Sequence, residues 1–162
     1  MKHSLSVVCF AFIFLSSCAP APQPTAEEAP SAEVDVAAIN KFEEEFSAVF
    51  KRLDVDAMAS MMTNDAVAML PGMPTVVGRE ACRSFWEEAL SQQTFDTHTV
   101  SLEEVVVDRG WAFVRATTES VFRIGDGEAQ EDAGKYIHIL RRQADGSWKL
   151  ARDIWNSDKP TE

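Results

Sequence analysis

The second half of the chain consists of four long segments with the alternation and composition of β-strands. The segments cover residues 95–107, 111–123, 129–142 and 147–156. Short glycine-containing turns separate them, at Asp108-Arg109-Gly110, Gly125-Asp126-Gly127 and Asp145-Gly146. Because such turns join neighbouring strands as hairpins, we expect an antiparallel meander. Strands of this length twist and curl, so one face of the sheet is expected to be concave.

The residues before this meander are predicted to be mostly helical. Residues 36–53 form an amphipathic helix with Asp35 as its N-cap, and its charged residues, among them Glu43, fall mostly off the apolar stripe. A second, shorter helix follows, and a third covers residues 79–90. Two short strands, residues 66–70 and 75–77, separate the last two helices. The helices precede the long strands, which indicates an α+β fold with three helices packed on the concave face of a strongly curved antiparallel sheet.

The N-terminus has the pattern of a bacterial lipoprotein signal. Lys2 and His3 precede an almost wholly apolar run, residues 5–15, which is too short to span a membrane. The run ends in Leu15-Ser16-Ser17-Cys18, which resembles the lipobox at which cleavage leaves an acylated cysteine. We therefore expect residues 1–17 to be a cleaved signal peptide and Cys18 to carry lipid. The alternative is an ordinary secretory signal with an incidental cysteine.

Residues 18–35 are predicted to be a tether, because they are rich in proline and contain no aromatic residue. By resemblance to Gram-negative lipoproteins, Ala19 after the cysteine favours the outer membrane, and more than one acyl chain makes such anchoring stable. The folded domain is then residues 36–158, on the periplasmic side, and residues 159–162 are a short tail.

Charge and cysteine content exclude several classes of function. The net charge of −11 at pH 7 is poorly suited to phosphate backbones, so nucleic acid is not expected as a partner. Cys82 is the one cysteine of the predicted domain, which excludes a disulfide within it. No closely spaced cysteine or histidine pair suggests a metal site, and no glycine-rich loop suggests a bound nucleotide. The sequence therefore indicates no metal and no cofactor.

Several short motifs, taken in order, resemble the SnoaL-like domains of the nuclear-transport-factor-2-like superfamily, to which ketosteroid isomerases also belong. The motifs are Thr63-Asn64-Asp65-Ala66-Val67, Val77-Gly78-Arg79-Glu80-Ala81, Gly134-Lys135-Tyr136, Asp145-Gly146-Ser147-Trp148-Lys149 and Arg152-Asp153-Ile154-Trp155-Asn156-Ser157. They match domain of unknown function 4440 best and cover nearly all of residues 36–158. The resemblance implies a cone-shaped fold, a cavity between sheet and helices, and often a homodimer through the outer face of the sheet. It implies no common reaction.

The last two long strands carry the candidate site residues. Alternation places Asp132, Tyr136 and His138 on one side of the third strand. In the last strand one set is Trp148, Leu150, Arg152, Ile154 and Asn156, and the other is Lys149, Ala151, Asp153 and Trp155. A single β-bulge would exchange these sets, so the sequence leaves open which of them faces the cavity.

His138 is the candidate general acid or base, because the unperturbed pKa of histidine is roughly 6.5. Asp153 is the candidate second base or the group that orients the histidine. The alternatives are a packing role for His138 and an ion pair of Asp153 with one of three arginines, Arg141, Arg142 or Arg152. His98 and Asp65 are expected to have no role in the chemistry.

The ligand-binding candidates are Tyr136, Trp155, Asn156 and Trp86. Tyr136 is the only tyrosine, and it lies on a strand, whereas the isomerase places a donor tyrosine on the first helix. Steroid isomerisation by that arrangement is therefore not predicted. We expect a lipid-anchored domain that binds a small, largely apolar molecule, either as a cofactor-free isomerase, cyclase or hydrolase or as a non-catalytic ligand-binding or dimerisation module.

Overall fold

A computed structural model describes residues 32–159 of the chain. Its elements follow the order α1 (Ala32–Lys51), α2 (Val55–Ser60), β1 (Met62–Met69), β2 (Val76–Val77), α3 (Arg79–Leu90), β3 (Gln93–Asp108), β4 (Trp111–Ile124), β5 (Gln130–Arg142) and β6 (Trp148–Ser157). The predicted signal peptide, Cys18 and most of the predicted tether lie outside the described residues. None of the helices in residues 32–159 is both long and apolar enough to span a membrane.

The strands form one six-stranded sheet in the order β2-β1-β6-β5-β4-β3. The four long strands make the predicted antiparallel meander. Strand β1 also joins this sheet, and it runs parallel to β6, which makes the sheet mixed rather than wholly antiparallel. Two parallel neighbours require a long connection between them, so this pair brings together strands from the two ends of the domain.

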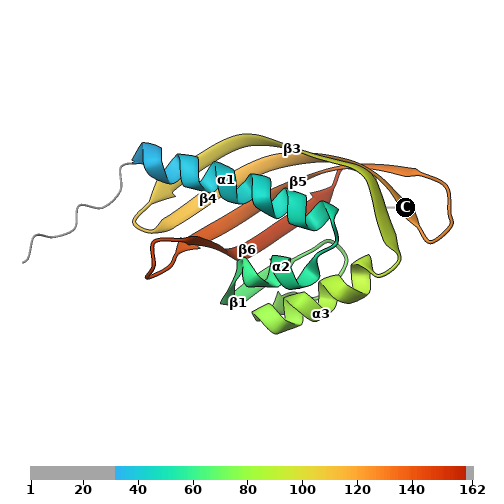
Figure 1. Cartoon of the computed structure of the whole chain (residues 1–162), viewed down its shortest axis with the longest axis horizontal. Helices are drawn as coiled ribbons and strands as arrows, with labels where there is room; N and C mark the ends of the chain where they lie inside the picture. The colour runs from blue at the N-terminus through green and yellow to red at the C-terminus, as the bar shows by residue number, and fades with distance from the viewer. Residues whose placement is uncertain (1–31, 160–162) are drawn as a thin grey trace, which may run out of the picture.

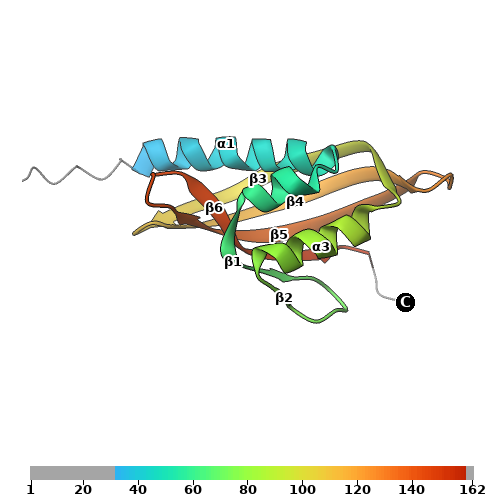
Figure 2. The same cartoon turned by 60° about the horizontal axis from the view of Figure 1, so that its bottom comes forward.

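The helices cover one face of the curved sheet. Helix α1 lies along the meander, whereas α2 and α3 lie near β1 and β2 (Figures 1 and 2). The apolar stripe of α1, which includes Ile39, Phe42 and Phe46, is buried against β-strand residues such as Val114 and Leu140. Bulges in the β3–β4 pair, after Phe95 and after Leu102, accompany the bend of these strands. The α+β prediction with helices on the concave face is confirmed.

Two predicted boundaries differ from the structure. Helix α1 begins at Ala32, so Asp35 lies inside the helix and is not its N-cap. Its carboxylate is buried and pairs with Arg142, which stacks on Trp148 at 4.5 Å. Strand β1 begins at Met62, four residues before the predicted strand at residues 66–70, and Met62 pairs with Leu150 of β6. In both cases a residue of the extended segment contacts a distant part of the sheet, Arg142 for Asp35 and Leu150 for Met62, and tertiary contacts of this kind can override short-range preference.

A β-bulge in β6 decides which side chains face the helices. Leu140 pairs with Leu150, whereas Ile139 pairs with Arg152, so Ala151 is an extra residue. Trp148 and Leu150 therefore share the inner face with Asp153 and Trp155. Asp153 is buried, and Asn156 is exposed on the outer face. The inner face of β6 thus combines parts of the two sets that strict alternation would keep apart.

Candidate functional site

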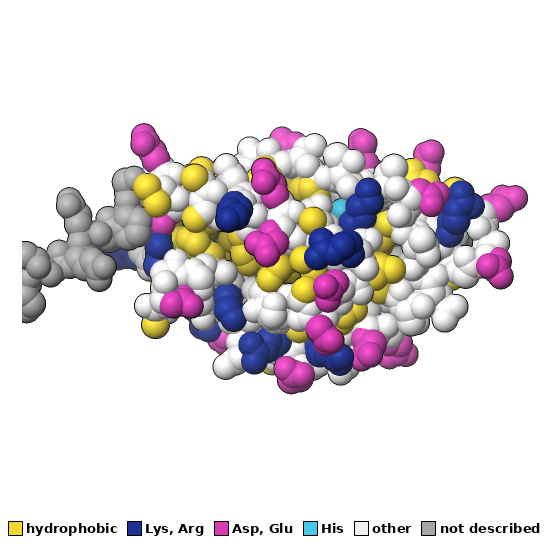
Figure 3. Space-filling model, in the orientation of Figure 1, with side chains coloured by type: hydrophobic (Ala, Val, Ile, Leu, Met, Phe, Trp, Pro, Cys, Tyr) yellow, Lys and Arg dark blue, Asp and Glu magenta, His cyan; other side chains and the backbone are white. Residues whose placement is uncertain are grey.

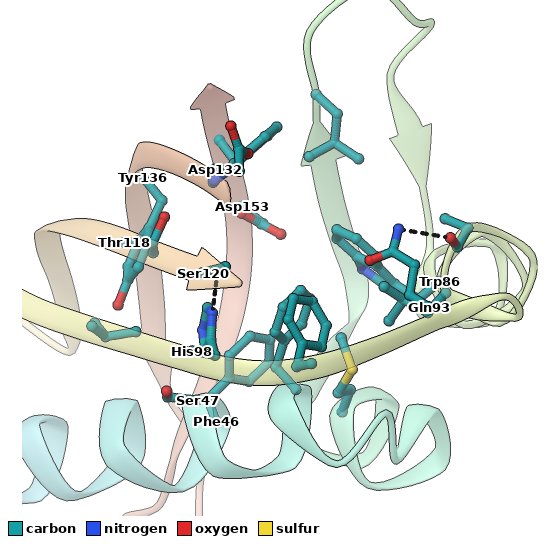
Figure 4. A pocket seen from close by; sticks show the side chains of 18 of the residues that line it. Phe46, Ser47, Trp86, Gln93, His98, Thr118, Ser120, Asp132, Tyr136 and Asp153 are labelled. Carbon is teal, nitrogen blue, oxygen red and sulfur yellow. Dashed lines mark hydrogen bonds between the residues drawn. The ribbon is translucent and has the colours of Figure 1, made fainter. Parts of the chain in front are cut away.

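A cavity of about 380 Å³ lies between the helices and the sheet. Its walls come from α1, α3 and the four strands of the meander, and residues 70–73 close one side. Most of the lining is apolar or aromatic, and the polar groups gather on the sheet side, as Figure 4 shows. In the space-filling view, apolar side chains gather between α1 and the α2–α3 pair (Figure 3). A largely apolar pocket with few polar groups is typical of a small-molecule site.

Glu43 of α1 is the centre of a buried polar network. Its side chain reaches across to β5, where it accepts a hydrogen bond from the hydroxyl of Tyr136 at 2.9 Å. It also accepts from Nδ1 of His138, at 3.0 Å for one carboxylate oxygen and 3.1 Å for the other. Glu43 is only 2% exposed. Such a buried carboxylate is stable only when paired and hydrogen-bonded, and both conditions hold here.

His138 lies between two carboxylates. Its Nδ1 atom faces Glu43, and its Nε2 atom lies 3.6 Å from the carboxylate of Asp153. Burial alone would lower the pKa of His138, but the charges and hydrogen bonds of the two acids outweigh it and raise the pKa to about 10. At neutral pH the imidazole is therefore a cation with a proton on each nitrogen; Nδ1 donates to Glu43, and Nε2 faces the carboxylate of Asp153. A group with this pKa is a poor proton shuttle at pH 7, so the structure argues against the predicted general acid–base role of His138.

Asp153 has its carboxylate on the wall of the cavity. It is 7% exposed, and within residues 32–159 its one polar side-chain partner is His138. The three arginines considered as partners are engaged elsewhere. Arg141 binds Asp65, Arg142 pairs with Asp35, and Arg152 donates to the backbone oxygens of Asp65 and Ala151. The ion-pair alternative for Asp153 is therefore wrong, and the carboxylate remains beside the cavity.

A second histidine, for which no role in the chemistry was predicted, lines the cavity. His98 of β3 lies 2.8 Å, through Nδ1, from the hydroxyl of Ser120 on β4. Its ring packs between Phe50 and Phe95, at centroid distances of 5.0 and 5.6 Å. Burial lowers the pKa of His98, and the nearby charge of Lys51 lowers it further. His98 is therefore neutral at pH 7, in contrast to His138.

The predicted ligand-binding residues divide into two groups. Tyr136, Trp86 and Trp155 line the cavity, as predicted for them. The hydroxyl of Tyr136 is already committed to Glu43, and burial with the nearby carboxylates raises its pKa. Asn156 does not line the cavity, because the bulge at Ala151 places it on the outer face. The expectation that Asn156 positions a ligand in this cavity is therefore corrected.

Trp155 owes its position to a glycine on the neighbouring strand. A Cβ atom on Gly134 would lie 2.9 Å from Nε1 of Trp155 and 2.7 Å from the backbone oxygen of Asn156. The absence of a side chain therefore lets the indole ring lie against β5 and form part of the cavity wall. Across the cavity, the buried indole nitrogen of Trp86 has no hydrogen-bond partner among the described residues.

Two signals in the sequence bear on Glu43 and His98. Glu43 was grouped with the charged residues off the apolar stripe of α1, and this was wrong. It follows Ile39 by four positions and precedes Phe46 by three, so helical spacing places it on that stripe, where it is buried. A charged residue on such a stripe indicates a buried pair. For His98 the signal is weaker, because its partner Ser120 is known only once the β3–β4 register is known. Within the described chain, no cluster of three or more His, Cys, Asp or Glu is arranged to hold a metal ion.

The fold and the cavity define a cone-shaped α+β domain of the type that encloses small molecules. Residues 44–151 match the SnoaL-like domain family, and the chain belongs to this family. The closer match to domain of unknown function 4440 remains a prediction. No curated protein matches the sequence at a significant level.

Solved structures agree with this assignment. A ketosteroid isomerase-like protein from Erwinia carotovora is 30% identical, with a TM-score of 0.73, and the match covers 78% of this chain and 98% of that one. A conserved protein from Planctomyces limnophilus is 25% identical, with a TM-score of 0.70, and the match covers 77% and 98% of the two chains. These proteins share the fold of this chain over nearly their whole length.

Proposed function

We propose that the domain is a cofactor-free enzyme that moves a proton on a small, largely apolar molecule, with Asp153 as the base. One observation carries this proposal: a carboxylate that is 7% exposed lies on the wall of an apolar cavity, backed by a buried imidazolium. Isomerisation and cyclisation both begin with such a proton removal. Membership of the SnoaL-like family and the similarity to an isomerase-like protein support the same class of reaction.

The buried network assigns separate roles to its members. Asp153 accepts the proton from the substrate. His138 is a positioning residue, because its positive charge lies 3.6 Å from the neighbouring carboxylate and holds it in orientation. Glu43 and Tyr136 hold that imidazolium in place from the opposite side. His98 supplies a neutral polar group, and when Ser120 donates to its Nδ1 atom, its Nε2 atom carries a proton for the substrate.

A neutral probe with one acidic C–H bond tests this role of Asp153. In 5-nitrobenzisoxazole a base removes the ring proton, the N–O bond breaks, and a coloured cyanophenolate forms without any cofactor. General-base catalysis contributes roughly 10²–10⁴-fold. We expect the protein to accelerate this reaction relative to buffer. We expect the isosteric Asp153→Asn substitution to reduce this acceleration by a factor of at least about ten. The Glu44→Gln variant is the matched control, because Glu44 is exposed on α1.

The second candidate is a non-catalytic ligand-binding module. The mutual pairing of Glu43, Tyr136 and His138 favours it. A network whose members satisfy one another's hydrogen bonds and charges can serve stability alone. This candidate predicts that the protein binds apolar molecules in the cavity but does not accelerate the ring opening of 5-nitrobenzisoxazole over buffer. Equal rates for the native protein and for Asp153→Asn would likewise exclude Asp153 as the base.

A homodimer through the outer face of the sheet is part of the proposal. On this face the strand register places apolar residues side by side: Val106 opposite Phe113, Phe113 opposite Ile139, and Ile137 opposite Ile154. Val106 is 50% exposed. A contiguous apolar sheet face of this kind suits a self-complementary interface. Sedimentation of the native protein and of Ile137→Glu tests this, and a native monomer would refute it.

We also propose that Cys18 is acylated and that it anchors the domain to the outer membrane on the periplasmic side. The support is the apolar run followed by Leu15-Ser16-Ser17-Cys18, with Ala19 after it. Mass spectrometry of the N-terminal peptide from a Gram-negative host would show the added mass of more than one acyl chain on Cys18, and Cys18→Ala would release the protein from the membrane fraction. An unmodified Cys18 would contradict the proposal.

A further inference from the structure

The ionisable groups that line the cavity are unbalanced in charge. Three of them are carboxylates, Glu43, Asp132 and Asp153, and the lining includes no lysine and no arginine. His138 is the one cation on these walls, and it is already held between Glu43 and Asp153. His98 adds no charge at pH 7, because burial and Lys51 lower its pKa. The described cavity therefore carries a net negative charge in a largely apolar setting.

Asp132 is the carboxylate of this group that the buried network does not use. Its side chain is 19% exposed, and it lies on the same wall of the cavity as Asp153 (Figure 4). One of its oxygens accepts a hydrogen bond from the hydroxyl of Ser157 at 2.8 Å. The ammonium group of Lys159 is 4.0 Å from the same oxygen, but Lys159 is more than half exposed. Such an exposed pair is weak, so the charge of Asp132 is only partly balanced.

The rest of the cavity suits a cation as well. Aromatic rings from four helix positions and from the sheet form most of its walls, among them Phe46, Phe50, Trp86, Phe95 and Trp155. The faces of such rings attract cations, and they do so more strongly where water is excluded. The whole chain has a net charge of −11, which draws positively charged molecules toward it and repels anions.

From these observations we infer that the cavity takes a hydrophobic amine, with its ammonium group at Asp132 and its apolar body against the aromatic walls. This inference concerns the same cavity as the proposed function and names the chemical class of molecule that occupies it. It excludes carboxylates and phosphates as preferred ligands, because no free cation in the described lining would pair with them.

Three ligands of matched shape test the inference: 1-naphthylmethylamine, 1-naphthalenemethanol and 1-naphthoic acid. At pH 7 the first is a cation, the second is neutral and the third is an anion. Binding is measured by calorimetry on the full protein. We expect the amine to bind at least about tenfold more tightly than the alcohol, and the acid to bind most weakly. Because the pairing takes place inside the cavity, raising the salt concentration should reduce this preference only in part.

Two variants assign the preference to Asp132. Asp132→Asn keeps the shape and the hydrogen bond from Ser157 but removes the charge, so the amine should lose its advantage over the alcohol. Ser157→Ala removes the same hydrogen bond but keeps the carboxylate, so the advantage should remain. Thermal unfolding of both variants checks that the fold is intact.

Three results would overturn the inference: an amine that does not bind, an amine that binds no better than the alcohol, and an Asp132→Asn variant with unchanged preference. The benzisoxazole test reports on Asp153 with a neutral probe. An amine preference without ring opening would therefore refute the proposed catalysis and leave this inference standing, and ring opening without an amine preference would do the reverse.

Discussion

Replacing Glu43 by glutamine removes one negative charge from the centre of the buried network. The amide is nearly isosteric, and its oxygen still accepts the hydrogen bond from Tyr136. The imidazolium of His138 then has only Asp153, at 3.6 Å, to balance its charge. The side chains of His138 and Glu43 are nearly inaccessible to water, so solvent cannot compensate for the lost negative charge. We expect Glu43→Gln to be strongly destabilising at neutral pH.

The size of this effect follows from the burial of the pair. The side chains of His138 and Glu43 are 5% and 1% exposed. Removing one partner of a buried ion pair costs about 3–5 kcal/mol. The remaining pairing with Asp153 reduces the loss, so we expect about 3 kcal/mol of unfolding free energy at pH 6–7. The exposed Glu44→Gln substitution on the same helix should stay within about 0.5 kcal/mol of the native protein.

The pH dependence gives the decisive measurement. The folded-state pKa of His138 is about 10, above the unfolded value of roughly 6.5, so its pairing stabilises the fold fully below pH 6.5 and loses effect as the pH rises toward 10. Removing Glu43 lowers this folded-state pKa. The cost of Glu43→Gln should therefore shrink with rising pH, by up to about 1.4 kcal/mol per pH unit where only the native protein keeps the proton. Urea unfolding from pH 6 to pH 9.5 measures it. A cost that does not change with pH would refute the ion pair.

Three further predictions concern packing, reactivity and the surface. Gly134→Ala should cost about 1–3 kcal/mol in urea unfolding, because the new Cβ meets the backbone of Asn156; unchanged stability would contradict the close approach. The thiol of Cys82 is 1% exposed, and burial raises its pKa, so a thiol reagent should label it only after unfolding; rapid labelling of the native protein would be inconsistent with this. Asp65→Ala should cost no more than about 1 kcal/mol although Asp65 accepts two hydrogen bonds from Arg141, since water reaches both side chains, which are 54% and 34% exposed; a larger loss in the same urea assay would show that the pair is not a surface one.

Local patterns predicted the elements that depend on short-range spacing. The third helix was predicted over the residues at which α3 is observed, and the meander strands agree to within two residues at most ends. Helical and strand periods are properties of the chain itself, so their reading does not require knowledge of the partner. Tyr136, Trp86 and Trp155 were candidates for the cavity wall, but the sequence left open which strand face points inward, and the structure places all three on that wall.

The candidate site depended on contacts that the sequence does not encode locally. Glu43 and His138 are 95 positions apart, and only the packing of α1 on β5 shows that they meet. That contact turns a histidine with an ordinary expected pKa into a permanent cation at neutral pH. For this reason the proposed function assigns the role of base to Asp153 and not to His138.

The amino-acid sequence by itself determined the helices, the meander and the likeness to a cone-shaped family, because period and turn chemistry act over a few residues. Only the tertiary structure determines which side chains of β6 face the helices, because the bulge at Ala151 exists only in the pairing with β5. It likewise decided which charges are buried, because the free energy of a buried charge depends on partners from distant segments. The chemistry of the cavity therefore depends on the bulge in β6 and on the pairing of the buried charges.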